Sequence, residues 1–166
     1  ATDDAGLASR SDDEIKNIIG LGLPEAIRLL YPDILDEKLE HVRQGYSAFF
    51  LGADVTPSPF FDGAMETMQA LADAGHSLAV ATGKSRRGLD RVLKKLDLHT
   101  FFHGSRCADE TVSKPDPKML TELLVEFNCA AAEAVMIGDT EYDMAMAQAI
   151  DMPRIAVSFG AHHIDR

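Results

Sequence analysis

The chain has 166 residues, of which 46% are hydrophobic and 26% are charged, and its formal net charge is −11. This composition is typical of a globular protein and argues against a disordered chain. The negative charge disfavours a nucleic-acid backbone or an anionic membrane surface as partner, although one lysine or one metal ion can still create a local site for a small anion.

Targeting signals and disulfides are not visible in the sequence. No apolar run is long enough to cross a membrane, and the first ten residues lack the basic and apolar segments of a signal peptide. Cys107 and Cys129 do not have the spacing of a disulfide framework, so we expect both to be free thiols. These features predict a cytoplasmic protein.

Residues 1 to about 52 are predicted to be helical throughout. Ser11 and Glu14 have the spacing of a capping box that opens a short helix, and Pro24 suits the first turn of a second helix. A third, longer helix is indicated by apolar residues that recur at spacings of four and three: Leu35, Leu39, Val42, Tyr46, Phe49 and Phe50. We expect a small helical domain that ends at the proline-rich segment Thr56-Pro57-Ser58-Pro59.

Residues 57–166 alternate between helical and strand patterns. Helices are predicted over 63–74, 89–96, from Pro117 onward and over 141–149, and short apolar runs predict strands over 77–81, 101–103, 134–137 and 154–157. Near-continuous apolar strands that alternate with helices are typical of a parallel sheet with helices on both faces. The predicted fold class is therefore α/β, a doubly wound parallel sheet in residues 57–166 with the small helical domain in front of it.

Three segments with polar side chains are predicted to meet at one edge of this sheet. The strand 77–81 ends in Thr82-Gly83-Lys84, the strand 134–137 ends in Gly138-Asp139 with Asp143 soon after, and Ser113-Lys114 precedes the helix at Pro117. In such sheets ligands bind beyond the carboxyl ends of the strands. Alone, each segment has an ordinary explanation, such as a turn with a helix cap or a solvated lysine.

Together the three segments favour a site for a metal ion and a phosphate group. Mg2+ prefers oxygen ligands and keeps several waters, so one or two carboxylates suffice; Asp139 is the better candidate, and Asp143 can reach metal-bound water or Lys114. The Thr82 hydroxyl and the Gly83 amide can hold a phosphate oxygen, and Lys114 supplies a point charge.

The three segments resemble, in order, motifs II, III and IV of the haloacid dehalogenase superfamily. They read Thr82-Gly83-Lys84, Ser113-Lys114-Pro115-Asp116-Pro117 and Gly138-Asp139-Thr140-Glu141-Tyr142-Asp143. Residues 1–56, with Gly-Leu-Gly-Leu-Pro-Glu-Ala-Ile at 20–27, resemble the small helical cap of its phosphoglycolate-phosphatase-like branch. The domains would thus be a cap, residues 1–56, and an α/β core, residues 57–166.

The resemblance implies a role for each residue of the site. Asp139 would bind Mg2+ with Asp143 in support, Thr82 and Gly83 would contact the transferring phosphoryl group, and Lys114 would hold the nucleophile and the phosphate in register. The cap would close over the substrate and expel water, with the loop 20–23 facing the reacting centre.

One part of the family pattern is missing. The family's motif I is an apolar strand that ends in Asp-x-Asp, in which the first aspartate attacks phosphorus and the second is the general acid and base. This strand lies at the centre of the sheet, between the strands equivalent to 77–81 and 134–137, and no segment of this sequence matches it. We therefore expect the chain to be a piece of a longer protein and to be inactive by itself.

The sequence-based hypothesis is that the intact protein is a cytoplasmic, Mg2+-dependent phosphatase of this superfamily. It would act on a small phosphorylated metabolite, with phosphoglycolate the first substrate to test, through an aspartyl-phosphate. Two alternatives remain open at this point. One is a pyrophosphatase or phosphosugar mutase of the same superfamily, and the other is a catalytically silent module that binds a phosphometabolite or a partner protein.

Overall fold

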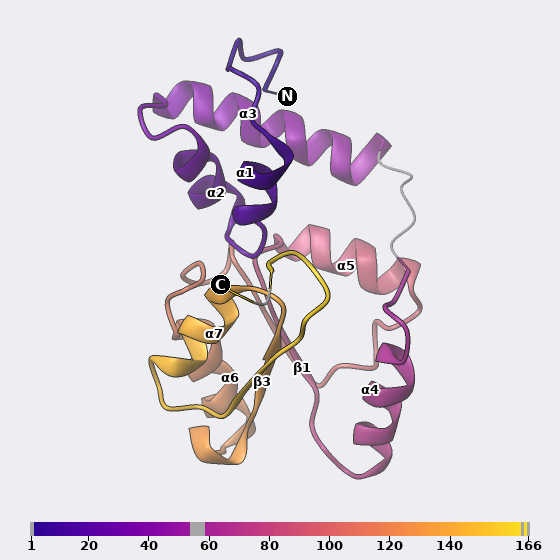
Figure 1. Cartoon of the computed structure of the whole chain (residues 1–166). Helices are drawn as coiled ribbons and strands as arrows, with labels where there is room; N and C mark the ends of the chain where they lie inside the picture. The colour runs from indigo at the N-terminus through magenta and orange to yellow at the C-terminus, as the bar shows by residue number, and fades with distance from the viewer. Residues whose placement is uncertain (1, 54–58, 164, 166) are drawn as a thin grey trace.

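A computed structural model describes residues 2–53, 59–163 and 165 (Figure 1). The N-terminal part consists of α1 (Asp12–Asn17), α2 (Leu23–Leu30), α3 (Asp36–Ala48) and the short π-helix η1 (Phe49–Ala53). Residues 2–53 contain helices and turns and no strand, in agreement with the helical pattern. The expected boundary between residues 56 and 57 lies outside the described residues.

The start of α1 has the predicted capping box. The Ser11 hydroxyl accepts the Glu14 N–H at 3.3 Å, and the Glu14 carboxylate accepts the Ser11 N–H at 2.9 Å. These bonds satisfy two backbone donors that a helix start otherwise leaves unpaired. They also hold the pKa of the exposed Glu14 below its usual value, because the Ser11 donors favour the carboxylate.

The prediction of one apolar stripe along the third helix is only partly right. Leu39 and Val42 are buried against α2, whereas Leu35 and Phe49 are exposed. Leu35 precedes α3 as its N-cap, and Phe49 follows it, so neither lies where α2 covers the helix. The buried core of the cap is consequently small.

The C-terminal part alternates helices and strands as expected. Its elements are α4 (Ala64–Asp73), β1 (Ala79–Thr82), α5 (Arg86–Lys95), β2 (Gly104–Cys107), α6 (Lys118–Phe127), the 3-10 turn η2 (Ala131–Glu133), β3 (Met136–Gly138), α7 (Glu141–Gln148) and β4 (Arg154–Ala156). The α/β class with parallel strands is confirmed.

The predicted strand over 101–103 is wrong, because the strand in this region is β2. Its sequence, Gly-Ser-Arg-Cys, lacks the apolar run by which buried strands are recognised. The polar side chains are instead satisfied by neighbouring helices: Arg106 pairs with Glu122 of α6 at 2.9 Å, and Arg86 of α5 donates to the Ser105 hydroxyl at 2.9 Å.

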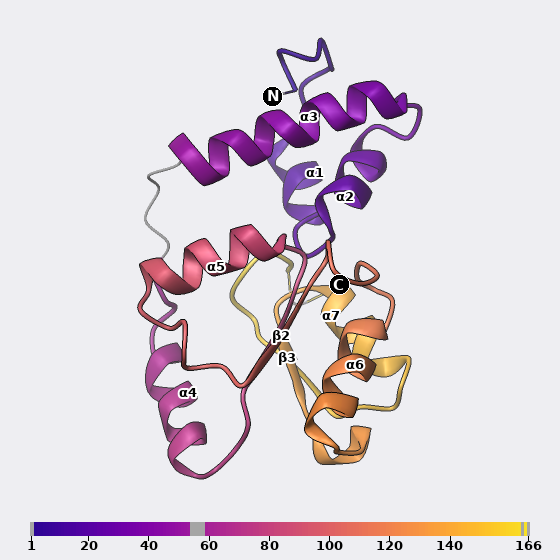
Figure 2. The ribbon, with the colours of Figure 1, turned by 180° about the vertical axis from the view of Figure 1, so that it is seen from behind.

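The strands form two parallel pairs. β1 pairs with β2 from Ala79↔Gly104 to Thr82↔Cys107, and β3 pairs with β4 from Met136↔Arg154 to Gly138↔Ala156. In the part of the chain that the structure describes, the two pairs are not hydrogen-bonded to each other. Both pairs lie in the middle of the domain (Figures 1 and 2), and β1 and β3 each have one edge without a strand partner among the described residues.

The helices cover the strands unequally. α6 and α7 lie on one side and pack around a core of Met119, Leu120, Met146, Ala147 and Met152. α4 and α5 lie on the other side (Figure 2), but no residue of α4 is buried. Ile137 of β3 is 49% exposed although it belongs to a strand. Apolar side chains of β3 and α4 are therefore left incompletely covered among the described residues.

No helix among the described residues is long and apolar enough to span a membrane.

The two cysteines are free thiols in different environments. Cys107, at the end of β2, is fully buried, and Cys129, after α6, is partly exposed. Burial raises the pKa of the Cys107 thiol to about 12, because the apolar surroundings disfavour the thiolate more than the nearby Arg86 guanidinium stabilises it.

Only Cys129 is expected to react quickly with iodoacetamide in the native protein at pH 8, since alkylation requires an accessible thiolate. Peptide mass spectrometry should show one modified cysteine under native conditions and two in denaturant. Labelling of Cys107 as fast as that of Cys129 would contradict the buried position of β2.

Candidate functional site

Lys114 and Asp143 form a buried ion pair where the loop before α6 meets the first turn of α7. Their side chains are 6% and 5% exposed, and the Lys114 Nζ lies 2.5 Å from Oδ1 of Asp143. The other carboxylate oxygen, Oδ2, accepts the Thr140 hydroxyl at 2.7 Å and the Thr140 N–H at 3.2 Å. Each buried charge is thus paired and hydrogen-bonded, as buried charges must be.

Of the two contacts expected for Asp143, the structure shows the one to Lys114. Its supporting part in a metal site stays a prediction. A Cβ atom on Gly138 would collide with the Asp143 side chain, which explains why the strand end carries a glycine before its aspartate.

Asp139 follows β3 directly and is held by the loop after β4. Its Oδ2 accepts the Ala161 N–H at 2.7 Å, and its backbone carbonyl oxygen accepts the His162 N–H at 3.2 Å. Its other carboxylate oxygen, Oδ1, has no hydrogen-bond partner among the described residues. Asp139 therefore presents one carboxylate oxygen in a fixed orientation, a suitable arrangement for a metal ligand.

Thr82 and Gly83 lie at the carboxyl end of β1. The Thr82 hydroxyl accepts the Lys84 N–H at 3.2 Å, so its own proton stays available to a ligand oxygen. A Cβ atom on Gly83 would collide with the Leu21 carbonyl oxygen, because a loop of the cap rests directly on this residue.

The loop 20–22 of the cap touches all three strand-end segments. The Gly22 N–H donates to the Ser113 hydroxyl at 2.7 Å, beside Lys114. Leu21 lies on Gly83, and a Cβ atom on Gly20 would come within 3.0 Å of the Thr140 hydroxyl. The loop therefore lies over the strand ends, and its expected position facing the reacting centre stays a prediction.

The far end of the cap contacts the core through cations and an aromatic ring. Phe50 of η1 has the Lys84 ammonium 5.4 Å and the Arg91 guanidinium 5.0 Å from its ring centroid. Lys84 remains exposed to solvent, and partial desolvation lowers the pKa of its ammonium.

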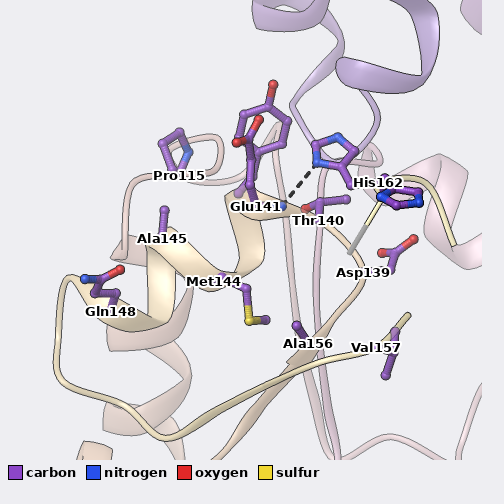
Figure 3. A pocket seen from close by; sticks show the side chains of 12 residues that line it. Pro115, Asp139, Thr140, Glu141, Met144, Ala145, Gln148, Ala156, Val157 and His162 are labelled. Carbon is purple, nitrogen blue, oxygen red and sulfur yellow. Dashed lines mark hydrogen bonds between the residues drawn. The ribbon is translucent and has the colours of Figure 1, made fainter. Parts of the chain in front are cut away.

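A cavity of about 440 Å³ opens beside Asp139 (Figure 3). Its walls come from the end of β3, from α7 and from the loop after β4, and they include Asp139, Thr140, Glu141 and His162. Thr82, Gly83, Lys114 and Asp143 are not part of its lining. The structure thus joins Lys114 with Asp143 and places Gly83 and Ser113 under one cap loop, but the cavity itself reaches only Asp139 among the expected site residues.

The described residues contain no group of three or more histidine, cysteine or acidic side chains arranged around one point. Mg2+ needs only one or two protein carboxylates and takes its remaining ligands from water and substrate phosphate. Asp139, with Oδ1 uncommitted, fits that requirement.

Sequence reasoning missed the loop after β4. Gly160, Ala161 and His162 surround Asp139, yet only the glycine at the carboxyl end of a predicted strand was a signal that could have drawn attention to them. Backbone donors such as the Ala161 N–H cannot be recognised from residue type.

Residues 2–157 match the family model described as "Haloacid dehalogenase-like hydrolase". Among curated proteins, "Probable phosphatase IndB" of Dickeya dadantii is 31% identical over 92% of this chain and 68% of its own length. A phosphoglycolate phosphatase of Agrobacterium fabrum is 26% identical over 94% of this chain and 69% of its own length.

Solved structures show the same fold. A protein of Bacteroides fragilis named as a haloacid dehalogenase-like hydrolase superposes with a TM-score of 0.89 at 24% identity, covering 99% of this chain and 79% of its own. A hydrolase from Pseudomonas syringae gives a TM-score of 0.83 at 20% identity, covering 99% and 76%. At these identities the likeness concerns the fold alone.

Substitution of Lys114 by methionine should destabilise the protein strongly, because Asp143 would remain buried and charged without its partner. Loss of one member of a buried pair typically costs about 3–5 kcal/mol in the free energy of unfolding. Urea denaturation followed by circular dichroism measures this change.

Lys118→Met is the matched control, because Lys118 is 53% exposed and lies 4.0 Å from Glu122. An exposed pair of this kind contributes about 0–1 kcal/mol. Equal effects of the two substitutions would mean that the Lys114 pair is not buried as described.

Proposed function

The chain belongs to the haloacid dehalogenase-like hydrolase family, and on this basis we propose that the full-length protein is a Mg2+-dependent phosphatase of a small phosphomonoester. Phosphoglycolate is the first substrate to test, since phosphoglycolate phosphatases occur among the relatives. The observation that carries the proposal is the buried Lys114–Asp143 pair, in which Asp143 stands in the first turn of α7, four residues after Asp139 at the end of β3.

Each residue of the site has a chemical task in this proposal. Lys114 uses one of its three N–H donors for Asp143, which leaves two for oxygens of the transferring phosphoryl group. The Thr82 hydroxyl and the Gly83 N–H hold further phosphoryl oxygens. Asp143 fixes the position and charge of Lys114, so that its ammonium need not reorganise during the reaction.

Asp139 is the residue of this chain that would hold Mg2+, through Oδ1. When bound there, the ion supplies positive charge that offsets the negative charge of the phosphoryl oxygens. The Ala161 N–H keeps Oδ2 occupied and thereby keeps the carboxylate in one orientation.

A nucleophile is still required, and we propose that it comes from an apolar strand ending in Asp-x-Asp that lies between β1 and β3. The supporting observations are the facing strand edges without partners among the described residues and the exposed side chain of Ile137. A parallel strand there would hydrogen-bond to both pairs and cover this surface.

The proposed reaction has two steps. An oxygen of the first aspartate attacks phosphorus, the ester bond to the leaving oxygen breaks, and the second aspartate donates a proton to the departing alcohol. Water, deprotonated by the second aspartate, then attacks the aspartyl-phosphate and releases inorganic phosphate and the free carboxylate. The cap loop 20–22 covers the strand ends, and the cap would close over the bound substrate and expel water.

The second candidate function is a catalytically silent module that binds a phosphorylated metabolite. It is favoured by one observation: no segment of this sequence matches the apolar strand ending in Asp-x-Asp that would supply the nucleophile. Such a module would bind phosphate esters without releasing phosphate.

Phosphate release from a panel of small phosphomonoesters tests the proposal. We expect the full-length protein to hydrolyse at least one of them, with Mg2+ required, and the 166-residue chain alone to release no phosphate. A correctly folded full-length protein that turns over none of the esters would contradict the phosphatase assignment and favour the binding module.

Asp139→Asn in the full-length protein should lower Mg2+-dependent turnover by about 100-fold or more, because the ligand loses its charge. Asp97→Asn is the control, since the Asp97 side chain is 94% exposed after the end of α5. Comparable activity of the two variants would remove Asp139 from the metal site.

A further inference from the structure

The loop after β4 grips Asp139 at two points. The Ala161 N–H donates to the side-chain oxygen Oδ2 at 2.7 Å, and the next N–H, that of His162, donates to the backbone carbonyl oxygen of Asp139 at 3.2 Å. Two successive amides of one loop therefore fix both the main chain and the carboxylate of a single residue. No regular pairing of β3 with β4 requires this, because the paired register ends one residue earlier at Gly138↔Ala156.

Gly160 allows the loop to approach this closely. Its φ of +123° is a conformation that side chains rarely adopt, and a Cβ atom there would overlap the Asp139 carboxylate. The backbone of Gly160 thus lies flat against the carboxylate and limits its rotation. A residue with any side chain would displace either the loop or Asp139.

His162 anchors the other end of the loop to α7. Its side chain is buried, with 7% of the residue exposed, and its Nδ1 accepts the Glu141 N–H at 3.2 Å (Figure 3). Glu141 is the first residue of α7, where helix N–H groups lack partners within the helix. The ring also meets Tyr142 edge-on, with 5.4 Å between the centroids.

The second ring nitrogen of His162, Nε2, is buried without a hydrogen-bond partner in the described residues. Burying a polar atom without a hydrogen-bond partner costs free energy. If residue 162 served only to fill space, a leucine there would avoid this cost. The contact that a leucine cannot make is the one through Nδ1. The presence of histidine is therefore explained by its anchoring bond to Glu141.

We propose that residues 160–162 are positioning residues that set the affinity of Asp139 for its divalent cation. Gly160 and Ala161 restrain the carboxylate, and His162 restrains the loop by its bond to the start of α7. This inference rests on the proposed function, in which Asp139 is the metal ligand of this chain. Groups that orient a metal ligand typically change metal affinity by about 10–100-fold when they are removed.

The test is the affinity of the full-length protein for Mn2+, measured by electron paramagnetic resonance without substrate. Gly160→Ala and His162→Leu should each weaken Mn2+ binding by about 10-fold or more. His162→Asn should stay within about threefold of the unchanged protein, because the asparagine side-chain oxygen can accept the Glu141 N–H in place of Nδ1.

Gly75→Ala is the matched control for Gly160→Ala. Gly75 also has a positive φ, +84°, but a Cβ atom there would meet nothing within 4 Å. The Gly75→Ala substitution introduces the same kind of backbone strain without contact with Asp139. It should therefore leave the affinity for Mn2+ unchanged. Urea denaturation of every variant separates loss of metal affinity from loss of fold.

Two results would overturn the proposal. One is equal Mn2+ affinity of His162→Leu, His162→Asn and the unchanged protein, and the other is equal affinity of Gly160→Ala and Gly75→Ala. Phosphate release by the same proteins at saturating Mg2+ is measured in parallel. It distinguishes rejection of the positioning role from failure of the proposed function. If the unchanged protein releases phosphate but all variants bind Mn2+ equally well, only the positioning role of residues 160–162 is rejected. If the unchanged protein releases no phosphate, the phosphatase assignment is rejected.

Discussion

The ion pair between Lys114 and Asp143 holds the site together. Lys114 belongs to the half of the domain that contains β1 and β2, and Asp143 belongs to the half that contains β3 and β4. Because these two strand pairs share no hydrogen bond in the described residues, the pair and the apolar core between α6 and α7 connect them. A buried charge is tolerated only with its partner in place, so the pair also fixes the distance between the loop before α6 and the strand end that carries Asp139.

The cap completes this arrangement. Its loop 20–22 rests on Gly83, Ser113 and Thr140, three positions that are distant in the sequence and come from all the segments expected at the site. Tyr142 adds a bond from its hydroxyl to the Asn17 carbonyl oxygen at 2.8 Å. Cap and core therefore meet where the phosphoryl group is proposed to bind. The glycines at 20, 22 and 83 are explained by this close approach, in which a side chain would meet the neighbouring segment.

The parts of the structure that follow from local patterns could be predicted from the sequence. The capping box at Ser11, the alternation of helices and strands and the strand end at Asp139 depend on neighbouring residues. β2 could not be recognised, because its Ser105 and Arg106 are stabilised by α5 and α6, which lie elsewhere in the chain. The partial exposure of the α3 stripe depends on how much of that helix α2 covers. The loop after β4 contacts Asp139 through backbone N–H groups. Nearly every residue type has such a group, so the sequence does not indicate these contacts.

The central claim is that Thr82, Lys114 and Asp139 serve one metal ion and one phosphoryl group. A crystal structure of the full-length protein with Mg2+ and beryllium fluoride, which mimics a phosphoryl group on an aspartate, tests it most directly. The account predicts Mg2+ on Oδ1 of Asp139, and fluorine atoms within hydrogen-bond distance of the Lys114 ammonium and the Thr82 hydroxyl. A structure in which the metal is bound without Asp139, or in which Lys114 and Thr82 face away from the fluoride group, would contradict it.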